Sequence, residues 1–210
     1  MATRFANPAG RVAGAAASWL LFAFVLTGLL LASATVIGLG GACASGGPYV
    51  SATPCPGSVL VFAPLGVFGT LAAVGISGTL AQDFAAPLYA WFWPLLFTGL
   101  GIVFLLGAVS GFGIVSNLLV AVVSLAMGLG PLVLGLRAGG LRTLLVGSRT
   151  VHGEPFDKPD ARTVLLRART AGTGNAVPIT AGRAALAVGI PFVSAAAGVV
   201  LAQLAVRALG

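Results

Sequence analysis

One long stretch of this chain is almost free of charge. Between Val12 and Leu136 the only formally charged residue is Asp83. A soluble domain carries roughly 25% charged residues, whereas only 7% of this chain is charged and 58% is hydrophobic. Water cannot solvate the surface of such a chain, so much of its exterior must face lipid. The sequence therefore predicts an all-α integral membrane protein.

Five stretches of the chain are long enough to cross a bilayer. A hydrocarbon core of about 30 Å needs roughly 20 apolar residues in a helix. The stretches that meet this requirement are residues 12–39, 60–81, 86–107, 114–136 and 184–206. Together they predict a single membrane domain, a bundle of about five transmembrane helices. The fifth stretch is the weakest, because it is rich in alanine and contains Gln203.

The basic residues predict the orientation. With the N-terminus inside, residues 1–11, 82–85 and 137–183 face the cytoplasm, and ten of the eleven Lys and Arg residues lie there. Only Arg207 is then outside, in agreement with the positive-inside rule. The chain is expected in the bacterial cytoplasmic membrane, with a long basic cytoplasmic loop at 137–183. The first span is far longer than the roughly 7–15 apolar residues of a signal peptide, so an uncleaved anchor is expected.

Both cysteines lie in one uncharged segment. Residues 40–58 contain three prolines and five glycines beside Cys43 and Cys55, a composition typical of turns. The expected topology places this segment on the oxidising side of the membrane, where disulfides persist. We therefore expect a structural disulfide between Cys43 and Cys55. A redox-active pair is disfavoured, because it would have Cys-x-x-Cys spacing, and lipidation of Cys43 is a further alternative.

The same segment resembles a known group of proteins. Cys43-Ala-Ser-Gly-Gly-Pro-Tyr49, followed by Pro54-Cys55-Pro56-Gly57, resembles the outer loop of small multi-pass membrane proteins from high-GC actinobacteria. The Ala-, Gly-, Val- and Leu-rich composition, with Arg far more frequent than Lys, is similar to theirs. The resemblance covers about 18 residues and the general pattern of spans. It supports the topology and implies no activity.

Small and polar residues line one face of the fourth span. Asn117, Ala121, Ser124 and Gly128 recur at spacings of four and three, and the opposite face is mostly large and apolar. A seam of small residues lets another helix approach closely, and Asn117 can form a hydrogen bond across it. This face predicts helix packing, inside the bundle or between chains, and its alternative is a polar-lined conduit.

Two other spans carry related patterns. Ser194 and Gly198 belong to a row of small residues along the fifth span, and they are assigned to the same packing or conduit role. Gly107 and Gly111 form a Gly-x-x-x-Gly pair at the end of the third span. Such pairs are typical of close helix contacts in membranes.

The loop at 137–183 is the only extended polar region of the chain. Its arginines suit anionic lipid headgroups, each contributing up to about 1 kcal/mol. The arginines expected to make these contacts are Arg137, Arg142, Arg162, Arg167 and Arg169. His152 lies close to three acidic residues, but the glycine and prolines among them give no fixed ligand geometry. Neither a metal nor a cofactor is expected.

The sequence carries no catalytic pattern. It has no nucleophile with a nearby base and no carboxylate pair within the spans, so an enzyme is not expected. Nucleic acid is not an expected partner either, because the basic residues flank apolar spans. We expect a non-catalytic membrane protein that packs with itself or with a membrane partner subunit. The alternative is a small channel or facilitator for uncharged or weakly polar solutes, with Asn117 and Ser124 lining the path.

The orientation can be tested with fusions. A reporter that is active only in the cytoplasm should be inactive when fused after Gly210, because five spans place the C-terminus outside. The same reporter fused after a truncation at Gly153 should be active. An active C-terminal fusion would mean that the fifth span does not insert, and an inactive Gly153 fusion would contradict the whole topology.

Overall fold

The chain folds into long helices. The computed structural model describes residues 8–44, 53–81, 85–111, 113–137 and 181–209. Their elements are α1 (Pro8–Gly38), α2 (Gly57–Ile76), the π-helical turn η1 (Ser77–Ala81), α3 (Leu88–Val109), α4 (Ile114–Arg137) and α7 (Ala181–Leu209). Five helices are long and apolar enough to cross a membrane, with η1 prolonging the second. The described residues form no strand, only an isolated bridge between Ala44 and Pro54. The chain is thus an all-α multi-pass membrane protein, and the predicted fold class is confirmed.

Proline and glycine determine where several helices begin and end. Pro56 and Pro87 precede α2 and α3, where the first helical N–H groups have no partner within the helix in any case. After α1, Gly40 and Gly41 have φ angles of 96° and 83°, a conformation that glycine adopts without a steric penalty. With η1 counted as part of the second span, the helix ends lie within four residues of the expected span ends.

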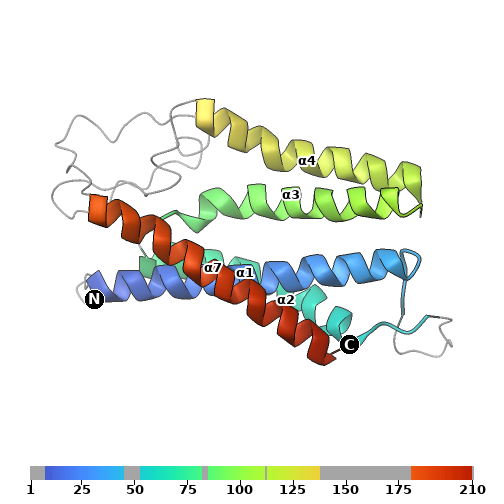
Figure 1. The fold of residues 1–210 in the computed structure, drawn as a ribbon, viewed down its shortest axis with the longest axis horizontal. Coiled ribbons are helices and arrows are strands. Elements are labelled where there is room, and N and C mark those ends of the chain that lie inside the picture. The colour runs from blue at the N-terminus through green and yellow to red at the C-terminus, as the bar shows by residue number, and fades with distance from the viewer. Residues whose placement is uncertain (1–7, 45–52, 82–84, 112, 138–180, 210) are drawn as a thin grey trace.

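α1 is the central helix of the bundle. It packs along α7 on one side and α2 on another, and it also contacts η1 and α3 (Figure 1). α3 and α4 form an antiparallel hairpin whose main attachment to the other helices is through α1. The chain therefore consists of a three-helix group, α1, α2 and α7, against which the α3–α4 hairpin lies.

Glycines bring the helices around α1 into close contact with it. A Cβ atom added to Gly66 or Gly69 of α2 would lie 2.6 Å from Leu29 Cβ or 2.7 Å from Val25 Cγ1. A Cβ added to Gly99 of α3 would lie 2.7 Å from Leu30 Cδ1. These distances are shorter than real Cβ contacts, so a side chain at any of these positions would force a neighbouring atom to shift, most severely at Gly66, which faces Leu29 Cβ. Large side chains of α1 pack against the backbone of α2 and α3 where glycine leaves it uncovered, as in other close membrane helix pairs.

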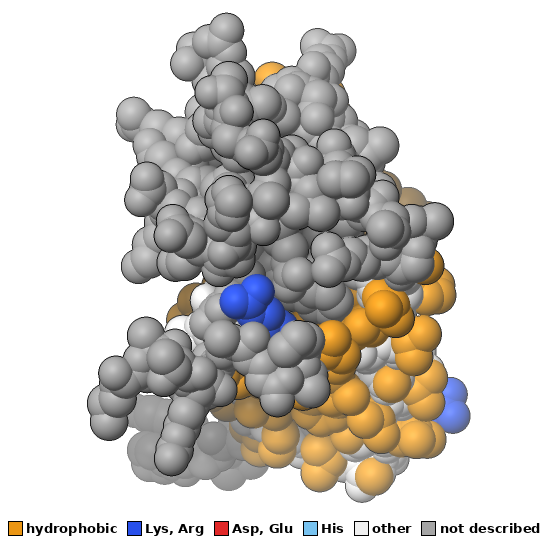
Figure 2. Space-filling model, turned by 90° about the vertical axis from the view of Figure 1, so that its left-hand side faces the viewer, with side chains coloured by type: hydrophobic (Ala, Val, Ile, Leu, Met, Phe, Trp, Pro, Cys, Tyr) orange, Lys and Arg blue, Asp and Glu red, His pale blue; other side chains and the backbone are white. Residues whose placement is uncertain are grey.

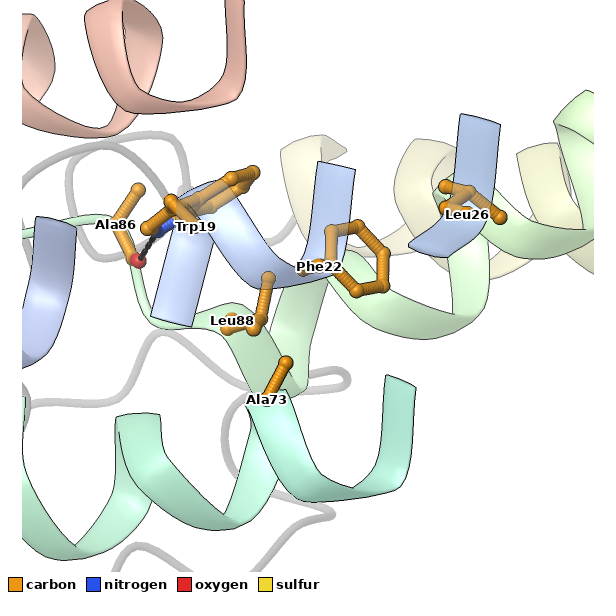
Figure 3. Close-up of a cluster of buried hydrophobic side chains, with 6 residues drawn as sticks. All are labelled: Trp19, Phe22, Leu26, Ala73, Ala86 and Leu88. Carbon is orange, nitrogen blue, oxygen red and sulfur yellow. Dashed lines mark hydrogen bonds between the residues drawn. The ribbon is translucent and has the colours of Figure 1, made fainter. Parts of the chain in front are cut away.

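The largest buried cluster joins α1 to the start of α3 (Figure 3). Trp19 and Phe22 of α1 pack edge-to-face, with ring centroids 6.1 Å apart. The Trp19 indole N–H donates a hydrogen bond of 2.9 Å to the Ala86 carbonyl oxygen, as the dashed line in Figure 3 marks. Leu88, whose side chain is fully buried, completes this contact. One indole thus anchors the segment that leads from η1 into α3.

The outside of the bundle is apolar. Only 22–33% of the most hydrophobic window of each span is buried within the chain. In Figure 2 the described part of one end of the molecule is largely covered by hydrophobic side chains. Water would strongly disfavour so much exposed apolar surface, whereas lipid solvates it. The exterior therefore agrees with a membrane location.

Trp19→Phe tests the anchor between α1 and α3. The variant keeps an aromatic ring but leaves the buried Ala86 carbonyl oxygen without its donor, which should cost about 1–3 kcal/mol. Thermal unfolding in mild detergent should therefore occur at a clearly lower temperature. Trp93→Phe is the matched control, because Trp93 is 41% exposed. Equal unfolding temperatures for the two variants would contradict the anchoring role.

Candidate functional site

The two cysteines are joined at one end of the bundle. Their sulfur atoms lie 2.04 Å apart and their Cα atoms 5.0 Å apart, so Cys43 and Cys55 form the disulfide expected from the sequence. The bond ties the end of α1 to the start of α2, and the Ala44 N–H donates to the Thr53 carbonyl oxygen beside it. We call this end of the bundle the disulfide end.

The small-residue face of α4 lies against α3. Asn117, Ala121 and Ser124 are buried, with exposed fractions of 8%, 0% and 7%. A Cβ atom on Gly128 would lie 2.7 Å from the Thr98 backbone nitrogen and 3.0 Å from the Pro94 carbonyl oxygen. The opposite face of α4 carries large apolar side chains that are exposed. They include Leu119, Val122, Val123 and Leu129. The small face of α4 is therefore in contact with a neighbouring helix of the same chain.

The corresponding face of α7 lies against α1 instead. A Cβ atom on Gly198 would overlap the Leu20 carbonyl oxygen and lie 2.9 Å from the Phe24 backbone nitrogen. Ser194 is half-buried on the same side of the helix. Because the faces of α4 and α7 contact different helices, they do not line a common path through the described part of the bundle.

The Gly-x-x-x-Gly pair of the third span is divided between two roles. Gly107 packs in α3, where an added Cβ would lie 2.7 Å from Ile37 Cγ2. Gly111 lies beyond the end of α3 with a φ angle of 89° and no heavy atom within 4 Å of its would-be Cβ. The expectation of a paired contact was therefore wrong for Gly111. This residue lies in the turn between α3 and α4, where its positive φ angle favours glycine.

The predicted headgroup contacts lie outside the described part of the chain. Arg142, Arg162, Arg167 and Arg169 fall within residues 138–180, and the side chain of Arg137 at the end of α4 is not described. His152 and the acidic residues near it fall there too. Among the described residues, no group of His, Cys, Asp and Glu side chains could hold a metal ion.

A groove opens between α1, α2 and the α3–α4 hairpin at the disulfide end. Its volume is about 530 Å³. α1 and the residues that follow it contribute one wall, and the other helices contribute the rest. The lining residues are Leu29, Ala32, Ser33, Val36, Ile37, Gly40, Gly41 and Ala42 on the α1 side, and Val59, Ala63, Phe104, Ser116 and Asn117 on the other. Of the predicted packing or conduit residues, the groove contains Asn117 alone.

The sequence did not reveal this groove. Its lining comes from separate turns of four helices. α1, α2 and α3 are hydrophobic on all sides, so no face of theirs is distinguished by composition, and the small face of α4 alone does not show which helices surround it. Gly66 and Gly69 of α2 and Gly99 of α3, which contact α1, were also missed. Their spacing in the sequence was visible, but the side chains that they contact were not.

No protein-family model matches the chain, and no curated protein or solved structure shows significant similarity to it. The fold and the geometry thus define the class of protein, an all-α membrane protein with five candidate spans.

A pair of glycine variants tests the packing of α4. Gly128→Leu should destabilise the protein by about 1–3 kcal/mol or more, because the new side chain forces α4 away from the α3 backbone. Gly130→Leu is the control, since no heavy atom lies within 4 Å of a Cβ at Gly130. Thermal unfolding in mild detergent measures both. Equal loss of stability in the two variants would contradict the close α3–α4 contact.

Proposed function

We propose that the chain is a non-catalytic protein of the bacterial cytoplasmic membrane that acts by packing against further copies of itself or against a partner subunit. Its N-terminus and the basic loop at 137–183 face the cytoplasm in this proposal. The distribution of Lys and Arg supports the orientation. The resemblance of the cysteine-containing segment to actinobacterial membrane proteins supports the location.

The observation that carries the proposal is the use of polar groups within the spans. Ser33, Thr35 and Thr70 each donate a hydrogen bond to a carbonyl oxygen four residues earlier in their own helix. Ser18 donates to Ala15, three residues earlier. Hydroxyl groups bonded in this way are satisfied within their own helix, and of these four only Ser33 lines the groove, so the four do not converge on a shared point. Side chains arranged for helix packing have this pattern, whereas catalysis and conduction require polar groups that converge.

The surfaces left for a partner are the large apolar faces. Phe68 on α2 is 71% exposed, Leu119 on α4 is 65% exposed and Phe192 on α7 is 75% exposed. The small faces that allow the closest approach are already occupied by other helices of the chain. A partner would therefore pack against large side chains, with van der Waals contact as the main attraction.

Photo-cross-linking in native membranes tests the proposal. A photoactivatable residue at position 68, 119 or 192 should give a discrete protein adduct from at least one position, either with a second copy or with a partner subunit. A photoactivatable residue in place of fully buried Ala121 is the control and should cross-link only within the chain. Lipid adducts alone from all three exposed positions would contradict the proposal.

The alternative function is passage of small uncharged or weakly polar solutes. Purified protein in liposomes would then accelerate the entry of glycerol or urea, measured by light scattering. We expect no acceleration above protein-free liposomes. An acceleration that a larger residue at Asn117 or Ser124 removes would favour the alternative.

A further inference from the structure

We propose that the groove at the disulfide end binds one hydrocarbon chain of a neutral membrane lipid that carries a free hydroxyl group. This inference does not rest on the packing function. Sites for small molecules commonly measure roughly 300–1,000 Å³, and the groove, at about 530 Å³, falls within this range.

The groove is a consequence of how the helices are spaced. At its edges α3 already contacts α1 as closely as glycine allows, through Gly107 on Ile37. α2 is held in the same way, with Gly66 on Leu29. The groove therefore lies between helices that already contact α1 closely at its edges.

The length of the groove matches a lipid chain. The part of α1 that lines it, from Leu29 to Ile37, extends about 12 Å at 1.5 Å per residue. Its depth therefore matches most of one leaflet, which is the reach of a lipid chain.

The polarity of the lining changes along its length. Nearer the middle of the bundle the lining residues are Leu29, Ala32 and Ala63, with Ser33 as the one polar side chain, whereas Ser116 and Asn117 lie at the start of α4. A lipid has the same gradient, from an apolar chain to a polar head at the membrane surface. A chain entering the groove would thus place its head beside the helix ends.

The chemistry of the lining favours a neutral head with a hydrogen-bond donor. None of the lining residues carries a charge, so the groove offers no counter-ion for a phosphate. The Ser116 hydroxyl donates its proton to the Gly113 carbonyl oxygen at 2.9 Å. Ser33 likewise donates to Leu29 at 2.8 Å. The Ser33 oxygen lies deeper, beside the position of the lipid chain. The Ser116 oxygen at the helix end keeps a lone pair that can accept, and a lipid hydroxyl supplies the matching donor.

Native mass spectrometry of the full chain in mild detergent, titrated with dioleoylglycerol, tests the proposal. The wild-type chain should take up one dioleoylglycerol molecule saturably. Ala63→Phe should weaken this binding by about tenfold or more, because the ring occupies the space of the lipid chain. Leu60→Phe, on the same helix, is the control. Leu60 is 52% exposed and does not line the groove, so this variant should leave binding unchanged.

A second pair of variants tests the contribution of the lipid head to binding separately from that of the lipid chain. Ser116→Ala should weaken dioleoylglycerol binding about fivefold, the worth of one hydrogen bond. Ser110→Ala is the control, because the Ser110 hydroxyl makes a similar bond to Gly107 but does not line the groove. Both exchanges are small and leave the helix packing intact, so they test the site even if Ala63→Phe fails to fold.

Three results would overturn the proposal. The first is the absence of a saturable adduct with the wild-type chain. The second is equal weakening by Ala63→Phe and Leu60→Phe, which is the behaviour of lipids that coat the whole surface. The third is tighter binding of anionic dioleoylphosphatidylglycerol than of dioleoylglycerol, since an uncharged groove would not favour a charged head.

Discussion

Close contact between α1 and the backbones of its neighbours is the constraint on which the rest of the structure depends. In hydrocarbon the hydrophobic effect does not drive helices together, so association relies on van der Waals contact and hydrogen bonds. Leu29, Leu30 and Val25 of α1 supply the side chains, and glycines of α2 and α3 supply the open backbone. α7 reverses the roles, because its Gly198 fits against the α1 backbone at Leu20. The position of every neighbour of α1 is determined by such contacts.

The arrangement has a functional consequence. Since the small faces of α4 and α7 are used inside the chain, the surfaces that remain are large and apolar. The Thr35 and Thr70 hydroxyls bond to their own helices, and neither lines the groove. The same glycine contacts that hold α2 and α3 against α1 leave the groove between them at the disulfide end. The proposed packing with partners and the proposed binding of a lipid chain would both follow from one set of helix spacings.

The sequence predicted the spans and the small-residue face of α4, but not which helix packs against that face. The almost complete absence of charge from Val12 to Leu136 was sufficient to place four helices. The spacing of Asn117, Ala121, Ser124 and Gly128 was sufficient to define a face. Periodicity identifies a face without saying which helix covers it, so the contact with α3 was not predictable.

Other features left weaker signals in the sequence. α2 and α3 are hydrophobic on every side, so nothing distinguished Gly66 or Gly99 as contact positions. Gly111 has the spacing of a packing glycine, yet its backbone conformation places it in a turn. The disulfide was predictable because the chain has only two cysteines and both lie in one uncharged segment. The groove was not, because it depends on distances among four helices.

The most direct test of α1 as the central helix is a cysteine pair between α1 and α7. Ala15 and Ala187 belong to one buried cluster, although 171 residues separate them in the chain. With an oxidant in native membranes, Ala15→Cys combined with Ala187→Cys should cross-link, and the two halves should stay joined after cleavage at a protease site inserted at Gly153. Ala15→Cys with Val188→Cys is the control, because Val188 is 42% exposed and should not cross-link. The packing of α7 against α1 would be contradicted if the two halves of the first double variant separate after cleavage, or if the second double variant cross-links instead of the first.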